Sequence, residues 1–251
     1  MPPRRKPAKP APPTEPRDQL ELRVKKIRER LAKAMPQPRC ELDHGDAWQL
    51  LIATILSAQS TDKTVNEVTP DLFTRWPTPA ALAEASQEEV EGVVHRTGFF
   101  RQKAKSIRNT SRALVVEHGG EVPRDMEALM RLPGVARKTA NLVMGTAFGQ
   151  ASGIIVDTHA KRVSARLGLT THDDPVKVEA DLCGLFARAS WVDMGHRLVL
   201  HGRYVCTARA PACERCPLNE VCPAAAGEPA GTWSARAAWE GQRVESRGEA
   251  G

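Results

Sequence analysis

Four cysteines near the end of the chain limit its folding more than any other feature. Cys206, Cys213, Cys216 and Cys222 follow one another with six, two and five residues between them. Residues 1–17 are proline-rich and basic, with no apolar stretch behind them, unlike a secretory signal. In the reducing compartment that this implies, closely spaced thiols favour one metal centre over disulfides.

Ligand chemistry alone leaves two metal groups open. A single Cys-x-x-Cys unit is present, whereas zinc sites more often use two, but zinc and a [4Fe–4S] cluster both accept four thiolates. Cys40 and Cys183 lie apart from this run, and Cys183 falls in an apolar helical stripe, where packing explains it.

The apolar periodicity between residues 18 and 224 is helical almost throughout. Leu20, Val24, Ile27 and Leu31 recur at spacings of four, three and four, and similar stripes follow near residues 48–56 and 178–186. The apolar run at 154–156 is too short to indicate a sheet. We therefore predict an all-α fold.

The net charge and the hydropathy of the chain restrict the kinds of partner that we expect it to bind. The net charge of +6 and the isoelectric point of about 9.1 suit a polyanion such as DNA, although many basic proteins bind no nucleic acid. No apolar run approaches the length of a membrane-spanning helix, so we expect no membrane partner. Residues 1–17 and 225–251 read as disordered tails, and the basic first tail could tether DNA weakly.

A Pro-Gly turn interrupts two predicted helices. The sequence Leu-Pro-Gly-Val-Ala at 132–136 separates a short helix over 125–131 from a second helix that starts near Arg137. The unpaired amides at the start of the second helix suit a phosphate, although the turn taken alone favours a simple packing corner between two helices.

Two ionisable residues stand out beside these elements. Lys138 lies in the first turn of the second helix, where the positive helix end and Arg137 disfavour its ammonium form and so favour a nucleophilic amine. A lysine at such a position is nonetheless more often solvated and inert. Asp157 follows the apolar run at 154–156 and precedes a helical stretch over 158–167. It could cap that helix, or stabilise positive charge on a sugar, or do both.

Together these residues resemble the endonuclease III family of helix–hairpin–helix glycosylases. The resemblance rests on Leu-Ser-Ala-Gln-Ser-Thr-Asp at 56–62, Leu-Pro-Gly-Val-Ala-Arg-Lys-Thr-Ala-Asn at 132–141, Val-Asp-Thr-His at 156–159 and the run that opens with His-Gly-Arg-Tyr-Val-Cys at 201–206. It spans about residues 18 to 224. It implies a [4Fe–4S] cluster on the four cysteines.

The resemblance also implies an architecture and a reaction. A six-helix domain at 40–150 with the helix–hairpin–helix would face a cluster domain made of 18–39 and 151–224, with double-stranded DNA between them. The enzyme would be a bifunctional DNA glycosylase and AP lyase that removes oxidised pyrimidines. Lys138 would attack C1′ and form a Schiff base, β-elimination would cut 3′ to the lesion or abasic site, and Asp157 would assist.

Further site residues follow from the same motifs. Gln59 matches the polar residue that fills the gap left by a flipped base, and Phe99 stands where relatives carry an apolar wedge, although core packing explains Phe99 as well. Asp62 and His159 would line the pocket. The residues expected to bind DNA through the hairpin are Leu132, Gly134, Val135, Ala136, Arg137 and Thr139. Ala136 replaces a glycine of the family pattern.

Other functions remain open at this stage. A monofunctional adenine glycosylase of the same superfamily would use the aspartate without a hairpin lysine, so Lys138 argues against it. A non-catalytic DNA-binding module would need neither Lys138 nor Asp157. An electron-transfer protein would not need a full helical scaffold. We expect a monomer located in the cytoplasm of a bacterial-type cell, with the nucleoid.

Overall fold

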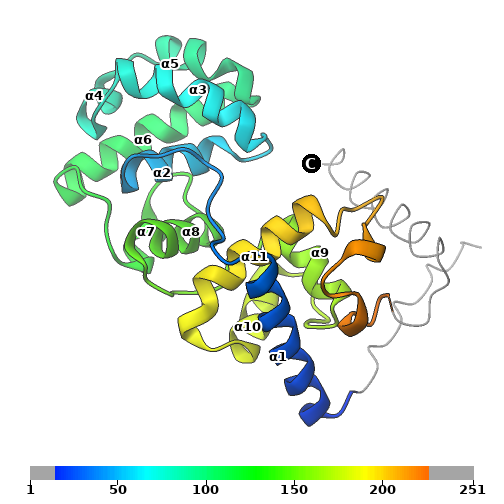
Figure 1. Ribbon diagram of the computed structural model, residues 1–251. Helices are drawn as coiled ribbons and strands as arrows, with labels where there is room; N and C mark the ends of the chain where they lie inside the picture. Colours follow the sequence, from blue (N-terminus) through cyan, green and yellow to red (C-terminus); the bar gives the residue numbers. More distant parts are fainter. Residues whose placement is uncertain (1–14, 226–251) are drawn as a thin grey trace, which may run out of the picture. The chain divides into compact units, whose positions relative to one another are not determined.

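The computed structural model describes residues 15–225. Helices joined by turns and loops make up these residues, with no strand among them (Figure 1). The prediction of an all-α fold is confirmed. The described residues form two compact units. One, here called the hairpin unit, contains residues 37–157 and 187–196. The other, the cysteine unit, contains residues 15–36, 158–186 and 197–225.

The hairpin unit is a bundle built around one long helix. Its helices are α2 (Ala47–Leu56), α3 (Asp62–Arg75), α4 (Pro79–Glu84), α5 (Gln87–Val94), η1 (His95–Thr97), α6 (Phe100–His118), α7 (Met126–Arg131), α8 (Arg137–Phe148) and η2 (Arg188–Ser190). Both α4 and α5 pack against α6, and α2 packs against α6 and α8 (Figure 1). Fully buried side chains of α2 and α6, such as Leu51, Leu56 and Ile107, form the core.

Side-chain caps explain where most of these helices begin. Asp46, Thr61, Thr78, Ser86 and Asp125 each accept a hydrogen bond from a first-turn amide of α2, α3, α4, α5 and α7, respectively. The starts of α6 and α8 differ, because their N-cap residues, Phe99 and Ala136, make no side-chain cap. The first amides of these two helices are therefore not capped by the residue that precedes them.

The cysteine unit joins the front of the described chain to its end. It contains α1 (Arg17–Ala34), α9 (Thr158–Arg166), α10 (Pro175–Leu185), η3 (Cys213–Arg215), η4 (Asn219–Val221) and most of α11 (Trp191–Tyr204). The boundary between the units passes through α11, between His196 and Arg197. Ile27 and Leu31 of α1 are fully buried, and the Arg30 guanidinium donates to the Pro217 carbonyl at 3.2 Å. Residues far apart in sequence thus build one core.

The predictions for the tails fall mostly on residues 1–14 and 226–251, which lie outside the described residues. The functional domain boundaries, 40–150 and 18–39 with 151–224, stay predictions. Among the described helices, none is both long and apolar enough to cross a membrane.

Candidate active site and metal centre

The turn between α7 and α8 needs a glycine. Gly134 has φ +78, and a Cβ there would lie 3.1 Å from the Ser106 Cβ of α6. The Thr110 hydroxyl, also on α6, donates to the Pro133 carbonyl. Backbone conformation and close packing therefore both require glycine at position 134. The turn packs directly on α6.

The start of α8 presents backbone amides. Ala136 is the N-cap, with φ −93 and ψ 168, an extended conformation that any residue adopts, so alanine here causes no backbone strain. The first amides of an α-helix have no acceptor within the helix, and the helix dipole adds positive potential there. Lys138, in this first turn, is exposed. The arrangement suits an anion beside a lysine.

The hairpin residues expected to bind DNA differ in exposure. Gly134 and Ala136 are exposed, and Arg137 is half-buried. The side chains of Leu132, Val135 and Thr139 are buried. Any contact from these three would come from the backbone, and their side chains hold the turn on the bundle.

Asp157 belongs to the same compact unit as Lys138. It is half-buried, directly before α9, and it follows the buried residues Ile154, Ile155 and Val156. A Cβ on Gly195 of α11 would lie 3.0 Å from the Ile155 amide nitrogen, so α11 packs tightly against this segment. The backbone before Asp157 is thus firmly held.

Gln59 and Phe99 share an unusual backbone. They are the only non-glycine residues of the described chain with positive φ, at 52° and 46°. Both are exposed, and 67% of Phe99 is accessible to solvent. A left-handed conformation at a bulky residue costs about 1–3 kcal/mol, and such strain gathers at functional sites. Because most of Phe99 is exposed, core packing, the other interpretation of this residue, does not explain it.

The two expected pocket residues lie in different units. Asp62 is half-buried in the first turn of α3, in the hairpin unit. His159 lies on α9 in the cysteine unit, and its Nδ1 is 3.3 Å from Nη2 of Arg162. Gly202 lets α11 approach α9, because a Cβ on it would lie 2.9 Å from the His159 Cβ.

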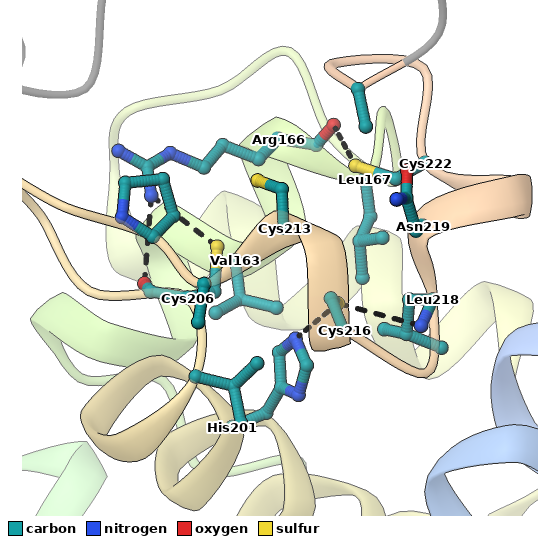
Figure 2. A pocket seen from close by; sticks show the side chains of 14 residues that line it. Val163, Arg166, Leu167, His201, Cys206, Cys213, Cys216, Leu218, Asn219 and Cys222 are labelled. Atoms are coloured by element: carbon teal, nitrogen blue, oxygen red, sulfur yellow. Dashed lines mark hydrogen bonds between the residues drawn. The ribbon is translucent and has the colours of Figure 1, made fainter. Parts of the chain in front are cut away.

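The four cysteines line one pocket of the cysteine unit, together with Val163 of α9, His201 of α11 and the apolar side chains of Leu167 and Leu218 (Figure 2). Two of their sulfur atoms receive hydrogen bonds from nitrogen. Nη1 of Arg166 donates to Cys206 Sγ at 3.3 Å, and the Leu218 amide donates to Cys216 Sγ at 3.4 Å. Such N–H···S bonds stabilise thiolates. The donor set therefore fits a thiolate-bound metal group.

Two further residues hold this loop, and sequence reasoning assigned no role to either. Arg166 is buried and donates to the carbonyls of Thr207 and Ala208 at 2.7 and 3.0 Å, so it fixes the loop after Cys206. Nε2 of His201 lies 3.5 Å from Cys216 Sγ (Figure 2). Arg166 lies three residues after buried Val163, on the buried face of α9. A charged residue on such a face was the feature of the sequence that could have indicated its role.

Burial changes the acid–base properties of this pocket. Burial lowers the pKa of His201 to about 4, so the ring is neutral at physiological pH. Burial also raises the pKa of the Cys216 thiol to about 11 and shifts that of Cys222 upward. Without a cation these thiols stay protonated. Metal binding must displace their protons, which is usual for thiolate ligands.

Comparison with known proteins identifies two matching family models. The model described as HhH-GPD superfamily base excision DNA repair protein matches residues 52–188, and the iron-sulfur binding domain of endonuclease III matches residues 206–222. Endonuclease III of Synechocystis sp. is 52% identical over 183 residues, which cover 73% of this chain and 84% of the relative.

The chain belongs to the endonuclease III family.

Other endonuclease III proteins are also similar to this chain in sequence and in structure. That of Escherichia coli is 44% identical over 184 residues, which cover 73% of this chain and 87% of the relative. A solved structure of a trapped endonuclease III–DNA covalent intermediate is 42% identical, with a TM-score of 0.77, and covers 81% of this chain and 95% of that one. A thermostable thymine-DNA glycosylase, at 22% identity and a TM-score of 0.70, shares the fold.

Membership of this family establishes the activity and the cofactor, which the residues alone had left open. The protein is a DNA glycosylase and AP lyase of base excision repair, and its cofactor is a [4Fe–4S] cluster rather than zinc.

Proposed function

We propose that Lys138 is the nucleophile of both the glycosylase and the lyase step, and that Asp157 assists it. The position of Lys138 supports this proposal most strongly: it is an exposed amine in the first turn of α8, at the helix end whose positive potential suits a phosphate. Asp157 lies in the same compact unit, after a firmly packed segment. A similar endonuclease III has been trapped as a covalent intermediate with DNA, which also supports attack by an enzyme nucleophile.

The proposed chemistry balances in two stages. The neutral Lys138 amine attacks C1′ as the bond from C1′ to the base breaks, and the base leaves with the bonding electrons and takes up a proton. The sugar ring opens to give a Schiff base between Nζ and C1′. Loss of a proton from C2′ then expels the 3′ phosphate, and water releases the lysine. The Asp157 carboxylate accepts the proton lost by Lys138 and stabilises the developing positive charge on the sugar.

The proposed DNA contacts come from three segments of the hairpin unit. Backbone amides at Gly134, Ala136 and Arg137 would hold a phosphate, which positions the duplex without reading its sequence. Gln59 would enter the space left by the flipped base. Phe99 would press against the adjacent stack as an apolar wedge. The exposure and left-handed backbone of Gln59 and Phe99 support these two roles.

We further propose that Cys206, Cys213, Cys216 and Cys222 hold the [4Fe–4S] cluster. Bound there, the cluster would supply four iron–sulfur bonds that cross-link the end of the described chain. Arg166 and the Leu218 amide would hydrogen-bond its cysteine sulfurs. The base removed would be an oxidised pyrimidine in double-stranded DNA. The pocket roles expected for Asp62, in the hairpin unit, and for His159, in the cysteine unit, stay predictions. The protein would act as a monomer in the cytoplasm, with the nucleoid.

Borohydride trapping tests the nucleophile. Wild type, Lys138→Gln and the control Lys105→Gln, which changes an exposed lysine of α6, are each incubated with a duplex that carries thymine glycol and with an abasic-site duplex. We expect a covalent complex with wild type and Lys105→Gln only, while Lys138→Gln still binds DNA. Trapping of Lys138→Gln at the wild-type level would contradict the proposal.

The same assay separates the two rival functions. Base release without trapping by wild type would indicate a monofunctional glycosylase in which Asp157 carries the chemistry. Neither release nor trapping, with DNA binding intact, would favour a non-catalytic binding module.

A further inference from the structure

Lys103 is a charged residue in the interior of the hairpin unit. Only 5% of it is accessible to solvent, although it lies in the first turns of α6, a helix with one exposed face. It falls on the buried stripe of that helix, four residues before Ile107. Burial lowers the pKa of its ammonium group. A buried amine is costly unless it is hydrogen-bonded, so its partner shows what it stabilises.

Lys103 is bonded on both sides of a kink in the backbone. Its Nζ donates to the Thr97 carbonyl at 2.6 Å, and its backbone N–H donates to the Phe99 carbonyl at 3.0 Å. Between these two carbonyls lie Gly98, with φ +69, and Phe99, with φ +46. One residue therefore ties down the peptide before the kink and the peptide after it.

The kink holds the Phe99 ring in solvent, although both the exposure of an apolar ring and the left-handed backbone cost free energy. Phe99 is 67% exposed, and its backbone is left-handed, which a bulky residue rarely adopts. No side chain caps α6 at Phe99. The Thr97 hydroxyl is engaged elsewhere, since it donates to the Val94 carbonyl at 2.8 Å. Thr97 is only 2% exposed, and the Lys103 ammonium is the side-chain donor to its carbonyl.

We propose that Lys103 is a positioning residue for strand opening: it holds residues 97–99 in the left-handed kink and so presents the Phe99 ring to the base stack. This inference rests on the wedge role proposed for Phe99. It adds a residue that touches neither DNA nor the reacting atoms. Without the ammonium, the buried Thr97 carbonyl would lose its partner, and the strained segment would relax and withdraw the ring.

A fluorescent base reports the opening directly. A duplex carries a tetrahydrofuran abasic analogue, which the enzyme cannot cleave because it offers no aldehyde to the lysine, with 2-aminopurine opposite it. The fluorescence of 2-aminopurine rises when it loses its stacking partners. The rise is measured at saturating holoenzyme for wild type, Phe99→Ala, Lys103→Met and Lys103→Arg. The control is Lys105→Met, which removes the same charge from the exposed side of α6.

We expect Phe99→Ala and Lys103→Met to reduce the rise about three-fold or more, because a buried carbonyl left without its donor destabilises the kink that carries the ring. Lys103→Arg keeps a cationic donor and should open the stack as wild type does, as should Lys105→Met. A merely structural role for Lys103 would lower the melting temperature without changing the rise at saturation.

The outcomes distinguish the positioning role of Lys103 from the wedge role of Phe99 on which it rests. If Phe99→Ala lowers the rise and folded Lys103→Met does not, Lys103 is not a positioning residue. If Phe99→Ala has no effect, the wedge role fails and the inference fails with it. If Lys103→Met does not fold, Lys103→Gln takes its place, because its shorter, uncharged side chain cannot keep the bond to the Thr97 carbonyl. A rise as low as that of Phe99→Ala then supports the inference, and a wild-type rise overturns it.

Discussion

At the scale of single residues, Asp157 shows how local packing can serve chemistry. Three buried apolar residues precede it and α9 begins directly after it, so its backbone has little freedom. Its side chain is only half-buried. A carboxylate on a fixed backbone is held in one place, as is needed to stabilise positive charge that develops on a sugar.

Asp157→Asn should therefore slow base release and leave DNA binding intact. The amide keeps the shape of the side chain but can neither accept a proton nor offset positive charge. We expect the single-turnover rate of base release to fall by about 10²–10⁴-fold, the usual contribution of a general base. The control Asp43→Asn changes an exposed aspartate of the same unit. A rate within a few-fold of wild type would show that Asp157 only supports α9.

His196 is a second residue whose surroundings make a measurable prediction. Its Nε2 lies 3.1 Å from the Thr146 hydroxyl, and burial lowers its pKa from 6.5, partly offset by the Asp193 carboxylate. Below that ordinary value the unfolded chain binds a proton that the folded chain resists. The free energy of unfolding therefore decreases as the pH falls below 6.5.

Replacing His196 with glutamine should flatten this dependence. A single titrating group contributes a slope of at most about 1.4 kcal/mol per pH unit, so the difference between wild type and His196→Gln should stay below that value. Urea unfolding between about pH 7 and pH 5 measures it. His95→Gln, at an exposed histidine, should follow wild type. Parallel curves for His196→Gln and wild type would mean that His196 binds its proton equally in both states.

At the scale of helices and turns, the sequence predicted elements better than their ends and kinks. The stripe of Val24, Ile27 and Leu31 is buried as α1, and the turn at 132–136 separates α7 from α8 where expected. Local periodicity suffices for such elements because one face must be buried. The left-handed backbone of Phe99 could not be predicted from apolar periodicity, because periodicity shows neither the φ angle of a residue before a helix nor the hydrogen bond from Lys103 Nζ to the Thr97 carbonyl.

The hairpin turn gives a prediction with a matched control. Gly134→Ala should destabilise the protein by about 1–3 kcal/mol, because alanine is strained at positive φ and its Cβ would press on Ser106. It should also weaken DNA binding, since the amides of the turn would shift. Gly92→Ala, in the middle of α5 with open space around its Cβ, should stabilise by about 0.5–1 kcal/mol.

Urea unfolding and binding to an abasic-analogue duplex give both readouts. Equal stability changes for the two alanine variants would contradict the strain at Gly134. Full DNA affinity in a destabilised Gly134→Ala variant would show that the turn packs the bundle without positioning DNA.

At the scale of the whole molecule, the pairing of distant segments was the hardest part to derive. The cysteine unit joins α1 to the cysteine loop through contacts such as Arg30 with Glu220, and periodicity carries no information about such partners. The resemblance to a family supplied this pairing, and the spacing of the four cysteines supplied the metal centre. The roles of Arg166 and Lys103 needed coordinates, because each buries a charge against carbonyls that the sequence does not show as neighbours.

Net charge is a property of the whole chain, and its last consequence concerns binding to undamaged DNA. The charge of +6 includes four basic residues, Arg4, Arg5, Lys6 and Lys9, and no acidic residue within the first fourteen positions. If this segment contacts phosphates, each contact releases counterions, and its removal should reduce the slope of log K against log salt by up to about 3.6. Fluorescence anisotropy with an undamaged duplex, across a salt series, measures the slope for the full chain and for a chain lacking residues 1–14. Trapping by borohydride at low salt should be the same for both, because Lys138 and Asp157 are unchanged. An unchanged slope would show that residues 1–14 make no phosphate contact and that the nonspecific attraction comes from the rest of the chain.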